Sequence, residues 1–398
     1  MPTREPRTSP LVPSYGARTL ADLSASILAS LAGDTGPAGD TGPARETGPA
    51  GEGGGNVLRL PPAPRACLLI IDGLGWELLR AHQAAAPFLS ELAFNSTPLT
   101  CGFPATTVTS LASLGTGLPP GQHGMVGYQV AVPGTGRLLN GLRWPDDIDP
   151  VDWQPRATVY QRAARAGIGA VYVAAPDLRG TGLSRAAFRS PEFRGAGSPG
   201  ALAAETRAAL HESERIMVTA YHGELDQNGH RYGAGSDAWT FQLAHADRIA
   251  EHIAGSLPPD TMLYITADHG MVNVAAEDRV DFDTTPELAE GVALLGGDAR
   301  ARHVYAEPGA AAGVLARWQE VLGDHAWVVS REEAVKEGWF GPVDDEVAAR
   351  IGDVIAADAA GGAVIASRGE PLESKMIGLH GSLTAAEQLV PLLSFASR

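Results

Sequence analysis

Short runs of consecutive apolar residues recur along the chain and alternate with longer segments of helical periodicity. The strand-like runs cover residues 67–71, 169–175, 215–221 and 262–267. Continuous apolar runs of this length are typical of strands that are buried on both faces of a parallel sheet. The segments with the spacing of amphipathic helices are 155–166, 201–214 and 237–255. This alternation predicts an α/β fold, a three-layer sandwich with a mostly parallel central sheet.

Two stretches between the strand-like runs do not follow this alternation. Residues 129–155 contain several Pro, Gly and Asp residues, which favour hairpins and loops. Residues 277–369 alternate short strands with short helices. We expect both to be cap insertions within one folded domain that spans residues 57–398, because a chain of this length has room for a large α/β unit with insertions.

The N-terminal segment, residues 1–56, is rich in Pro and Gly, and we expect it to be disordered. From residue 33, glycine recurs at every third position over much of a short repeat, until Arg45 breaks the period. A collagen-like trimerisation segment is the alternative. It would need longer repeats with proline-rich positions, so the pattern favours a disordered linker.

Composition and charge argue against several classes of protein. Hydrophobic residues make up 44% of the chain, enough for a full core, and the net charge is −16. A protein this acidic repels phosphate backbones at long range, so we do not expect it to bind nucleic acid polymers. No apolar run has the length of a membrane span or the form of a secretory signal, so we expect a cytoplasmic protein with no membrane partner. Nothing in the sequence predicts an oligomeric state.

Aspartate and histidine residues stand directly after the strand-like runs or beside glycines. They are Asp72, Asp226, His230, Asp268, His269 and His380. Open α/β sheets bind their ligands at the carboxyl ends of the strands, which is where such side chains would gather. Carboxylate and neutral imidazole groups are ligands that suit Zn²⁺.

Each of these residues also has an ordinary structural interpretation. Asp72 with its following glycine reads equally well as a turn. Asp226 and His230, four residues apart, could be a solvated loop pair, and Asp268 could cap a helix. Six such residues at strand ends are harder to explain separately, and together they favour a metal site.

A second candidate feature is the stretch from residue 103 to residue 128. Pro104 suits the first turn of a helix, which places Thr106 and Thr107 at a helix N-terminus, where free N–H groups favour negative charge. A threonine hydroxyl there can become a nucleophile if a metal or a base assists it. The simpler alternative is a threonine that only caps the helix.

The order of these residues along the chain resembles the alkaline phosphatase superfamily, and within it the nucleotide pyrophosphatase/phosphodiesterase branch. The resemblance extends from residue 67 to residue 381 and implies two zinc ions. One ion would be held by Asp226, His230 and His380, and the other by Asp72, Asp268, His269 and the oxygen of Thr107. The residue pair Thr116-Gly117 resembles a family motif, and counting back from it selects Thr107 as the nucleophile, with Thr106 as the alternative.

The resemblance implies a phosphodiesterase or nucleotide pyrophosphatase that acts on a small phosphoester, possibly a nucleotide, through a phosphothreonine intermediate. Tyr128 stands where this branch usually has an asparagine that binds a phosphate oxygen, so we expect Tyr128 to contact substrate. Residues 103–136 contain no Lys or Arg, which favours a diester over a dianionic monoester. The alternatives are a phosphomonoesterase or phosphonate hydrolase on the same scaffold, and a metal-binding regulatory protein without turnover. Trp144 and Trp153 are further candidates for shaping the pocket.

Overall fold

The computed structural model describes residues 9–34, 55–189 and 192–397. Its centre is a six-stranded sheet in the order β18-β8-β1-β7-β5-β6. The strands are β1 (Arg65–Ile71), β5 (Gly169–Ala174), β6 (Glu192–Gly195), β7 (Ile216–His222), β8 (Thr261–Thr266) and β18 (Leu393–Ala396). All neighbours pair in parallel except β18, which runs antiparallel to β8. The predicted α/β fold with a mostly parallel central sheet is confirmed.

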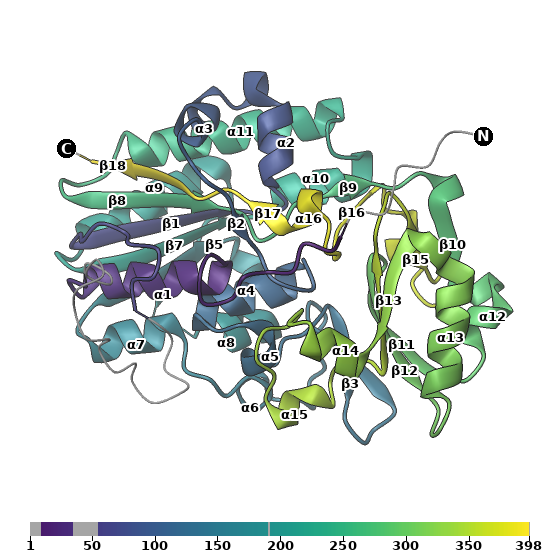
Figure 1. Ribbon diagram of the computed structural model, residues 1–398. Coiled ribbons are helices and arrows are strands. Elements are labelled where there is room, and N and C mark those ends of the chain that lie inside the picture. Colours follow the sequence, from purple (N-terminus) through teal and green to yellow (C-terminus); the bar gives the residue numbers. More distant parts are fainter. Residues whose placement is uncertain (1–8, 35–54, 190–191, 398) are drawn as a thin grey trace, which may run out of the picture.

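Helices cover both faces of this sheet (Figure 1). On one face lie α1 (Leu20–Leu31), α4 (Thr107–Thr116), α7 (Val159–Arg165) and α8 (Gly182–Ala187). On the other lie α3 (Pro87–Ala93), α9 (Pro199–His211) and α11 (Asp237–Ala254). Because β1 is covered from both sides, every residue from Ala66 to Ile71 is buried, which accounts for its continuous apolar sequence.

A second sheet stands apart from the first, to the right in Figure 1. This cap sheet is antiparallel, in the order β11-β12-β14-β13, and has a hydrophobic cluster of its own with α13 (Ala311–Leu322). Its strands are β11 (Val292–Asp298), β12 (Ala301–Ala306), β13 (Ala326–Ser330) and β14 (Val354–Asp358). The hairpin of β3 (Gln129–Val132) and β4 (Arg137–Asn140) packs against β11.

Shorter elements connect the two sheets. At the ends of the parallel strands begin α2 (Trp76–Ala81) and α10 (Glu224–Tyr232), and β16 (Gly378–Leu379) pairs with β9 (Val272–Asn273) close to α10. Near the C-terminus, α16 (Ala385–Gln388) leads into β17 (Leu389–Val390), which pairs with β2 (Leu99–Thr100). None of the described helices combines the length and the apolar character that a membrane span requires.

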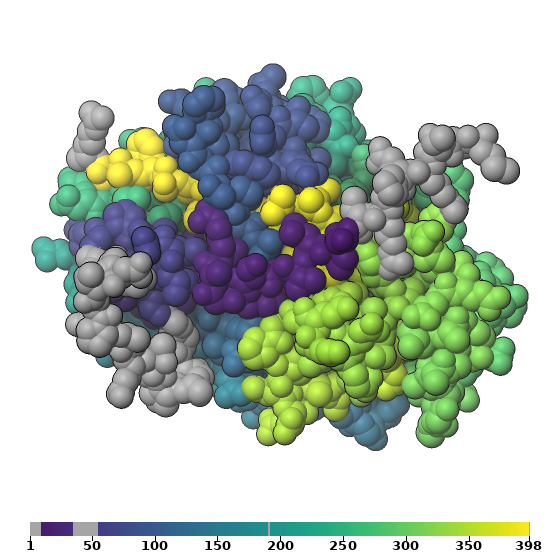
Figure 2. Space-filling model, viewed as in Figure 1, coloured from purple at the N-terminus to yellow at the C-terminus, as the bar shows by residue number. Residues whose placement is uncertain are grey.

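The prediction that residues 1–56 are disordered is wrong for residues 9–34. Leu20, Leu23 and Ile27 on α1 have no exposed surface, and Thr19 begins the helix with a capping box. Ahead of α1, the chain runs over the surface between the parallel-sheet body and the segment that follows β13 (Figure 2). There the Tyr15 hydroxyl donates a hydrogen bond to the carbonyl oxygen of Trp339 at 2.8 Å. Burial of these apolar side chains supplies the free energy that orders the segment. Most of the glycine-rich repeat lies outside the described residues.

Candidate metal centre

Three neighbouring parallel strands deliver four of the predicted ligands to one edge of the sheet. Asp72 follows β1 directly, Asp268 and His269 come just after β8, and α10, which starts after β7, carries Asp226. Since β8, β1 and β7 are adjacent and parallel, their carboxyl ends meet. His230 lies one turn further along α10, and His380 follows β16, which packs against that helix.

The ligand atoms form two clusters, and within each cluster they lie within 4.8 Å of one another. In the first, His230 Nε2 is 3.2 Å from Asp226 Oδ2, and His380 Nε2 is 3.9 Å from Asp226 Oδ1. The two clusters adjoin, because the His380 ring stacks on the His269 ring of the second at 3.6 Å between centroids. Each cluster combines imidazole and carboxylate groups, a donor set that could hold a metal ion.

In the second cluster, His269 Nε2 lies 3.5 Å from Asp72 Oδ1 and 3.5 Å from Asp268 Oδ2. Asp268 is fixed through its other oxygen, which accepts hydrogen bonds from the backbone N–H groups of Gly73 and His269 at 3.1 and 3.0 Å. Asp72 is fixed in the same manner by the hydroxyl of Tyr221, which donates to Asp72 Oδ2. One oxygen of each carboxylate is therefore held by the protein, and the other faces the cluster.

All three histidines are oriented by hydrogen bonds to backbone carbonyls. Nδ1 of His230, His269 and His380 lies 2.7, 3.0 and 2.8 Å from the carbonyl oxygens of Gly378, Gly270 and Ala105 respectively. A carbonyl only accepts, so Nδ1 carries the proton in each ring and the lone pair of the neutral ring is on Nε2. This is the arrangement that metal-binding histidines adopt in proteins.

The carboxylates are crowded and buried. Burial raises the pKa of Asp72 well above its usual value, and the nearby charges of Asp268 and Asp226 raise it further. Burial also lowers the pKa of His380 well below its usual value, with a contribution from His269. Burial and the neighbouring carboxylates thus disfavour the ionised form of Asp72, and a divalent cation would offset that cost.

Unpaired oxygen atoms support the same conclusion. Among the described residues, Asp72 Oδ1, Asp226 Oδ1 and Asp268 Oδ2 are buried and have no hydrogen-bond partner. Buried carboxylate oxygens are normally paired, because leaving one unpaired costs on the order of 1–3 kcal/mol. All three belong to the two clusters, so the residues present fit metal ions at both.

The two candidate nucleophiles differ in what they contact. Thr107 is the first residue of α4 and its Oγ1 lies 3.2 Å from His269 Nε2. Thr106, the N-cap, is almost fully buried and its hydroxyl points towards the cap sheet, 3.5 Å from Asp298 Oδ1. Thr107 therefore adjoins the metal-ligand candidates, and Thr106 does not.

A cavity of about 250 Å³ opens over Thr107 and the first cluster. Tyr128 lines it as expected, but its hydroxyl is engaged with Glu373 Oε1 at 3.4 Å. Trp144 and Trp153 do not line this cavity; the Trp153 ring instead stacks under the Arg350 guanidinium. Part of the wall was not predicted from the sequence and is formed by Arg143, Asp298, Glu370 and Glu373.

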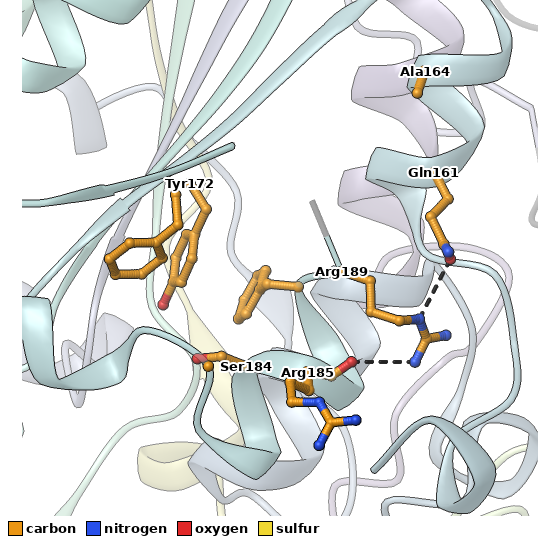
Figure 3. Close-up of a pocket in the computed structure, with 9 residues that line it drawn as sticks. Gln161, Ala164, Tyr172, Ser184, Arg185 and Arg189 are labelled. Carbon is orange, nitrogen blue, oxygen red and sulfur yellow. Dashed lines mark hydrogen bonds between the residues drawn. The ribbon is translucent and has the colours of Figure 1, made fainter. Parts of the chain in front are cut away.

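A larger cavity, of about 450 Å³, lies beside β5 and β6 and is lined by residues of α7 and α8 (Figure 3). Tyr172 and Phe188 stack there at 4.4 Å, and Arg189 is held by Gln161 and by backbone carbonyls. None of the metal-ligand candidates borders it. Size therefore does not identify the functional site in this protein, whereas the donor groups do.

Comparisons with known proteins indicate the family. The family described as Type I phosphodiesterase / nucleotide pyrophosphatase matches residues 66–383. Ectonucleotide pyrophosphatase/phosphodiesterase family member 7 is 37% identical over 84 residues in Rattus norvegicus and 34% identical over 84 residues in Homo sapiens. These matches span 19% of this chain and no more than 19% of each relative.

Solved structures share the fold. Murine ectonucleotide pyrophosphatase / phosphodiesterase 5 superposes with a TM-score of 0.68 at 16% identity, covering 84% of this chain and 88% of that one. Phosphonoacetate hydrolase from Sinorhizobium meliloti 1021, solved in complex with phosphonoacetate, gives a TM-score of 0.63 at 19% identity, covering 84% and 91%. With the family match extending from β1 to beyond His380, the chain belongs to the Type I phosphodiesterase / nucleotide pyrophosphatase family.

Proposed function

We propose that this protein is a two-zinc phosphoric ester hydrolase, a phosphodiesterase or nucleotide pyrophosphatase, with Thr107 as its nucleophile. The observation that carries the proposal is the convergence of two Asp/His clusters on Thr107, which is the first residue of α4 and lies 3.2 Å from His269. A regulatory metal-binding protein would have no need of a hydroxyl at that position.

The ligand sets follow from the two clusters. Asp226, His230 and His380 would hold one ion, and Asp72, Asp268 and His269 the other, with the Thr107 oxygen beside them. Bound zinc would supply Lewis acidity, lowering the pKa of a nearby hydroxyl and offsetting the charge of the phosphoryl oxygens. Nitrogen and oxygen donors in this mixture suit Zn²⁺.

The residues of the chain account for the chemical steps. Thr107 Oγ1 loses its proton to water and forms a bond to phosphorus, while the bond from phosphorus to the leaving oxygen breaks and that oxygen takes up a proton from water. Backbone N–H groups at the start of α4 can donate hydrogen bonds to the phosphoryl oxygens, where negative charge develops. A water molecule then displaces Thr107 from the phosphothreonine and restores the hydroxyl.

The cavity favours a small monoanionic diester, such as an ester of a nucleoside monophosphate. Among the residues that line it, Arg143 is the only Lys or Arg, and its guanidinium is exposed and lies 3.8 Å from Glu373. A phosphomonoester carries an additional negative charge that no free cation of this wall offsets. Murine ectonucleotide pyrophosphatase / phosphodiesterase 5 was solved as an inactive variant in complex with AMP, and a diester that contains a nucleoside monophosphate is therefore a natural first substrate to test.

Replacement of the two threonines tests the nucleophile. Thr107→Ala should reduce kcat for bis-p-nitrophenyl phosphate by about a thousandfold or more, as removal of a covalent nucleophile does in other hydrolases. Thr106→Ala is the matched control and should cost far less, since its hydroxyl faces Asp298. A larger effect at Thr106 would contradict the assignment, and so would full activity of Thr107→Ala.

Parallel assays with bis-p-nitrophenyl phosphate and p-nitrophenyl phosphate test the substrate class. We expect the diester to have the higher kcat/KM. A clear preference for the monoester would instead favour a phosphomonoesterase. If the zinc-loaded protein hydrolyses neither these esters nor a phosphonate, it is a metal-binding protein without turnover.

A further inference from the structure

A fourth carboxylate, that of Asp298, has a buried oxygen without a hydrogen-bond partner among the described residues, as the metal-ligand aspartates do. The atom is Asp298 Oδ2, and its counterparts are one oxygen each in Asp72, Asp226 and Asp268. Those three face the two clusters, but Asp298 belongs to neither cluster. It therefore requires a different partner.

Asp298 is placed at the end of β11, where the cap sheet meets the site. It lines the same cavity as Thr107, and its Oδ1 is 3.5 Å from the hydroxyl of Thr106, the residue before the nucleophile. On its other side passes the loop that carries His380, since a Cβ added at Gly381 would lie 3.3 Å from the Asp298 Cβ. A group bound to Asp298 would thus lie in the same cavity as Thr107, the proposed nucleophile.

The turn after Asp298 is held in place by buried contacts. Arg300 in that turn is fully buried and donates to both carboxylate oxygens of Glu387 at 2.8 Å, and to Asp358 at 3.2 Å. At Gly297, φ is +77° and a Cβ would approach the Ala301 carbonyl oxygen to 2.1 Å, so the tight turn requires glycine. The backbone that carries Asp298 is therefore fixed beside the cavity.

The neighbouring carboxylates of the wall already have partners. Arg302 binds both oxygens of Glu370, at 3.1 and 2.7 Å. Arg143 and Tyr128 lie by Glu373. Of the carboxylates of Glu370, Glu373 and Asp298 in this wall, only that of Asp298 forms no ion pair with Arg302 or Arg143.

We propose that Asp298 is a specificity residue that accepts a hydrogen bond from a hydroxyl or ammonium group on the part of the diester that stays attached to phosphorus. The proposal rests on the proposed function. It defines the substrate class as phosphodiesters that carry a hydrogen-bond donor a few bonds from phosphorus. A donor there completes the pairing of Asp298, whereas an apolar group would leave its oxygen buried and unpaired.

Three substrates with the same leaving group test this class: the ethyl, 2-hydroxyethyl and 2-aminoethyl esters of p-nitrophenyl phosphate. The zinc-loaded wild-type protein should hydrolyse the hydroxyl or the amino substrate with a kcat/KM at least about tenfold above that of the ethyl substrate. The two donor substrates distinguish a hydroxyl from an ammonium group. Because the hydroxyl of the 2-hydroxyethyl ester can itself attack phosphorus and release p-nitrophenol, the rate with Thr107→Ala is subtracted for every substrate. Equal values for all three would overturn the proposal and leave the proposed function intact, while no hydrolysis of any ester would overturn the proposed function itself.

Asp298→Asn tests the residue. The variant should lose most of the preference, so that kcat/KM for the favoured substrate falls at least about tenfold more than that for the ethyl substrate. Glu373→Gln is the matched control, because it removes the same charge from the same wall but from a carboxylate with partners, and it should largely retain the preference. Equal losses on all substrates, or a lower zinc content in Asp298→Asn, would contradict a specificity role. If Asp298→Asn does not fold, the preference of the wild-type protein for the hydroxyl or amino substrate over the ethyl substrate still tests the proposed substrate class.

Discussion

Single side chains at this site are held by hydrogen bonds that leave one atom of each free for a ligand. Nδ1 of His230, His269 and His380 is used by a backbone carbonyl, which directs Nε2 into the clusters. The Tyr221 hydroxyl does the equivalent for Asp72. Tyr221 is opposite Ile70 in the register of β7 and β1, so neighbouring parallel strands supply the ligand and the group that orients it. Such supporting contacts commonly affect metal affinity as much as the ligands do.

Removing the Tyr221 hydroxyl should therefore weaken metal binding. Tyr221→Phe is expected to lower the zinc affinity by about 10–100-fold, the usual range for loss of a contact that orients a ligand. Competition against a chromophoric chelator measures this directly. Tyr264→Phe is the matched control, since the Tyr264 hydroxyl on β8 is buried and has no hydrogen-bond partner in the described part of the chain. Equal zinc affinities for the two variants would show that Tyr221 does not orient Asp72.

At the scale of elements, the cap sheet is attached to the body through the buried Arg300. Its guanidinium joins the β11–β12 turn to Glu387 on α16 and to Asp358 on β14. Glu387 in turn binds the loop after His380 through the Ser382 N–H at 2.9 Å. The wall of the cavity and a metal-ligand loop are thus fixed to each other.

Breaking this connection should destabilise the whole protein. Arg300→Met leaves two carboxylates buried without their cation and is expected to lower the free energy of unfolding by about 3–5 kcal/mol. Urea denaturation followed by circular dichroism measures the change. Arg137→Met, at the exposed pair with Asp147, is the control and should have little effect. A similar small effect at Arg300 would contradict its anchoring role.

Packing of the helix α1 on the body should also contribute to the free energy of unfolding. Leu23→Ala removes a side chain with no exposed surface and should cost about 2–5 kcal/mol of unfolding free energy, whereas Phe94→Ala at an exposed position should change it little. Urea denaturation compares the two. An unchanged midpoint for Leu23→Ala would mean that residues 9–34 do not pack on the body.

These elements also indicate what the sequence could reveal. The parallel strands and their terminal aspartates were predictable because continuous apolar runs and Asp-Gly junctions are local signals. The helical spacing of Leu20, Leu23 and Ile27 after Thr19 is equally local, but the Pro- and Gly-rich composition around it favours a disordered segment. Asp298 could not be found in this way, because its unpaired oxygen follows from contacts that span the chain, such as that between Arg300 and Glu387.

At the scale of the whole molecule, the site lies where the carboxyl edge of the parallel sheet meets the cap sheet (Figure 1). The body supplies the two Asp/His clusters and Thr107, and the cap sheet and the segments beside it supply the wall that faces the substrate. This division allows the chemistry to stay constant while the wall sets which ester is accepted. The cytoplasmic location stays a prediction.

The central claim is that the two clusters hold two zinc ions, and metal analysis tests it most directly. After dialysis against zinc and removal of the excess, mass spectrometry of the metal content should find two zinc ions per chain. A variant with Asp226→Ala and His380→Ala, which disables the first cluster only, should retain one. Wild-type protein with no tightly bound zinc, or an unchanged zinc content in that variant, would contradict the account.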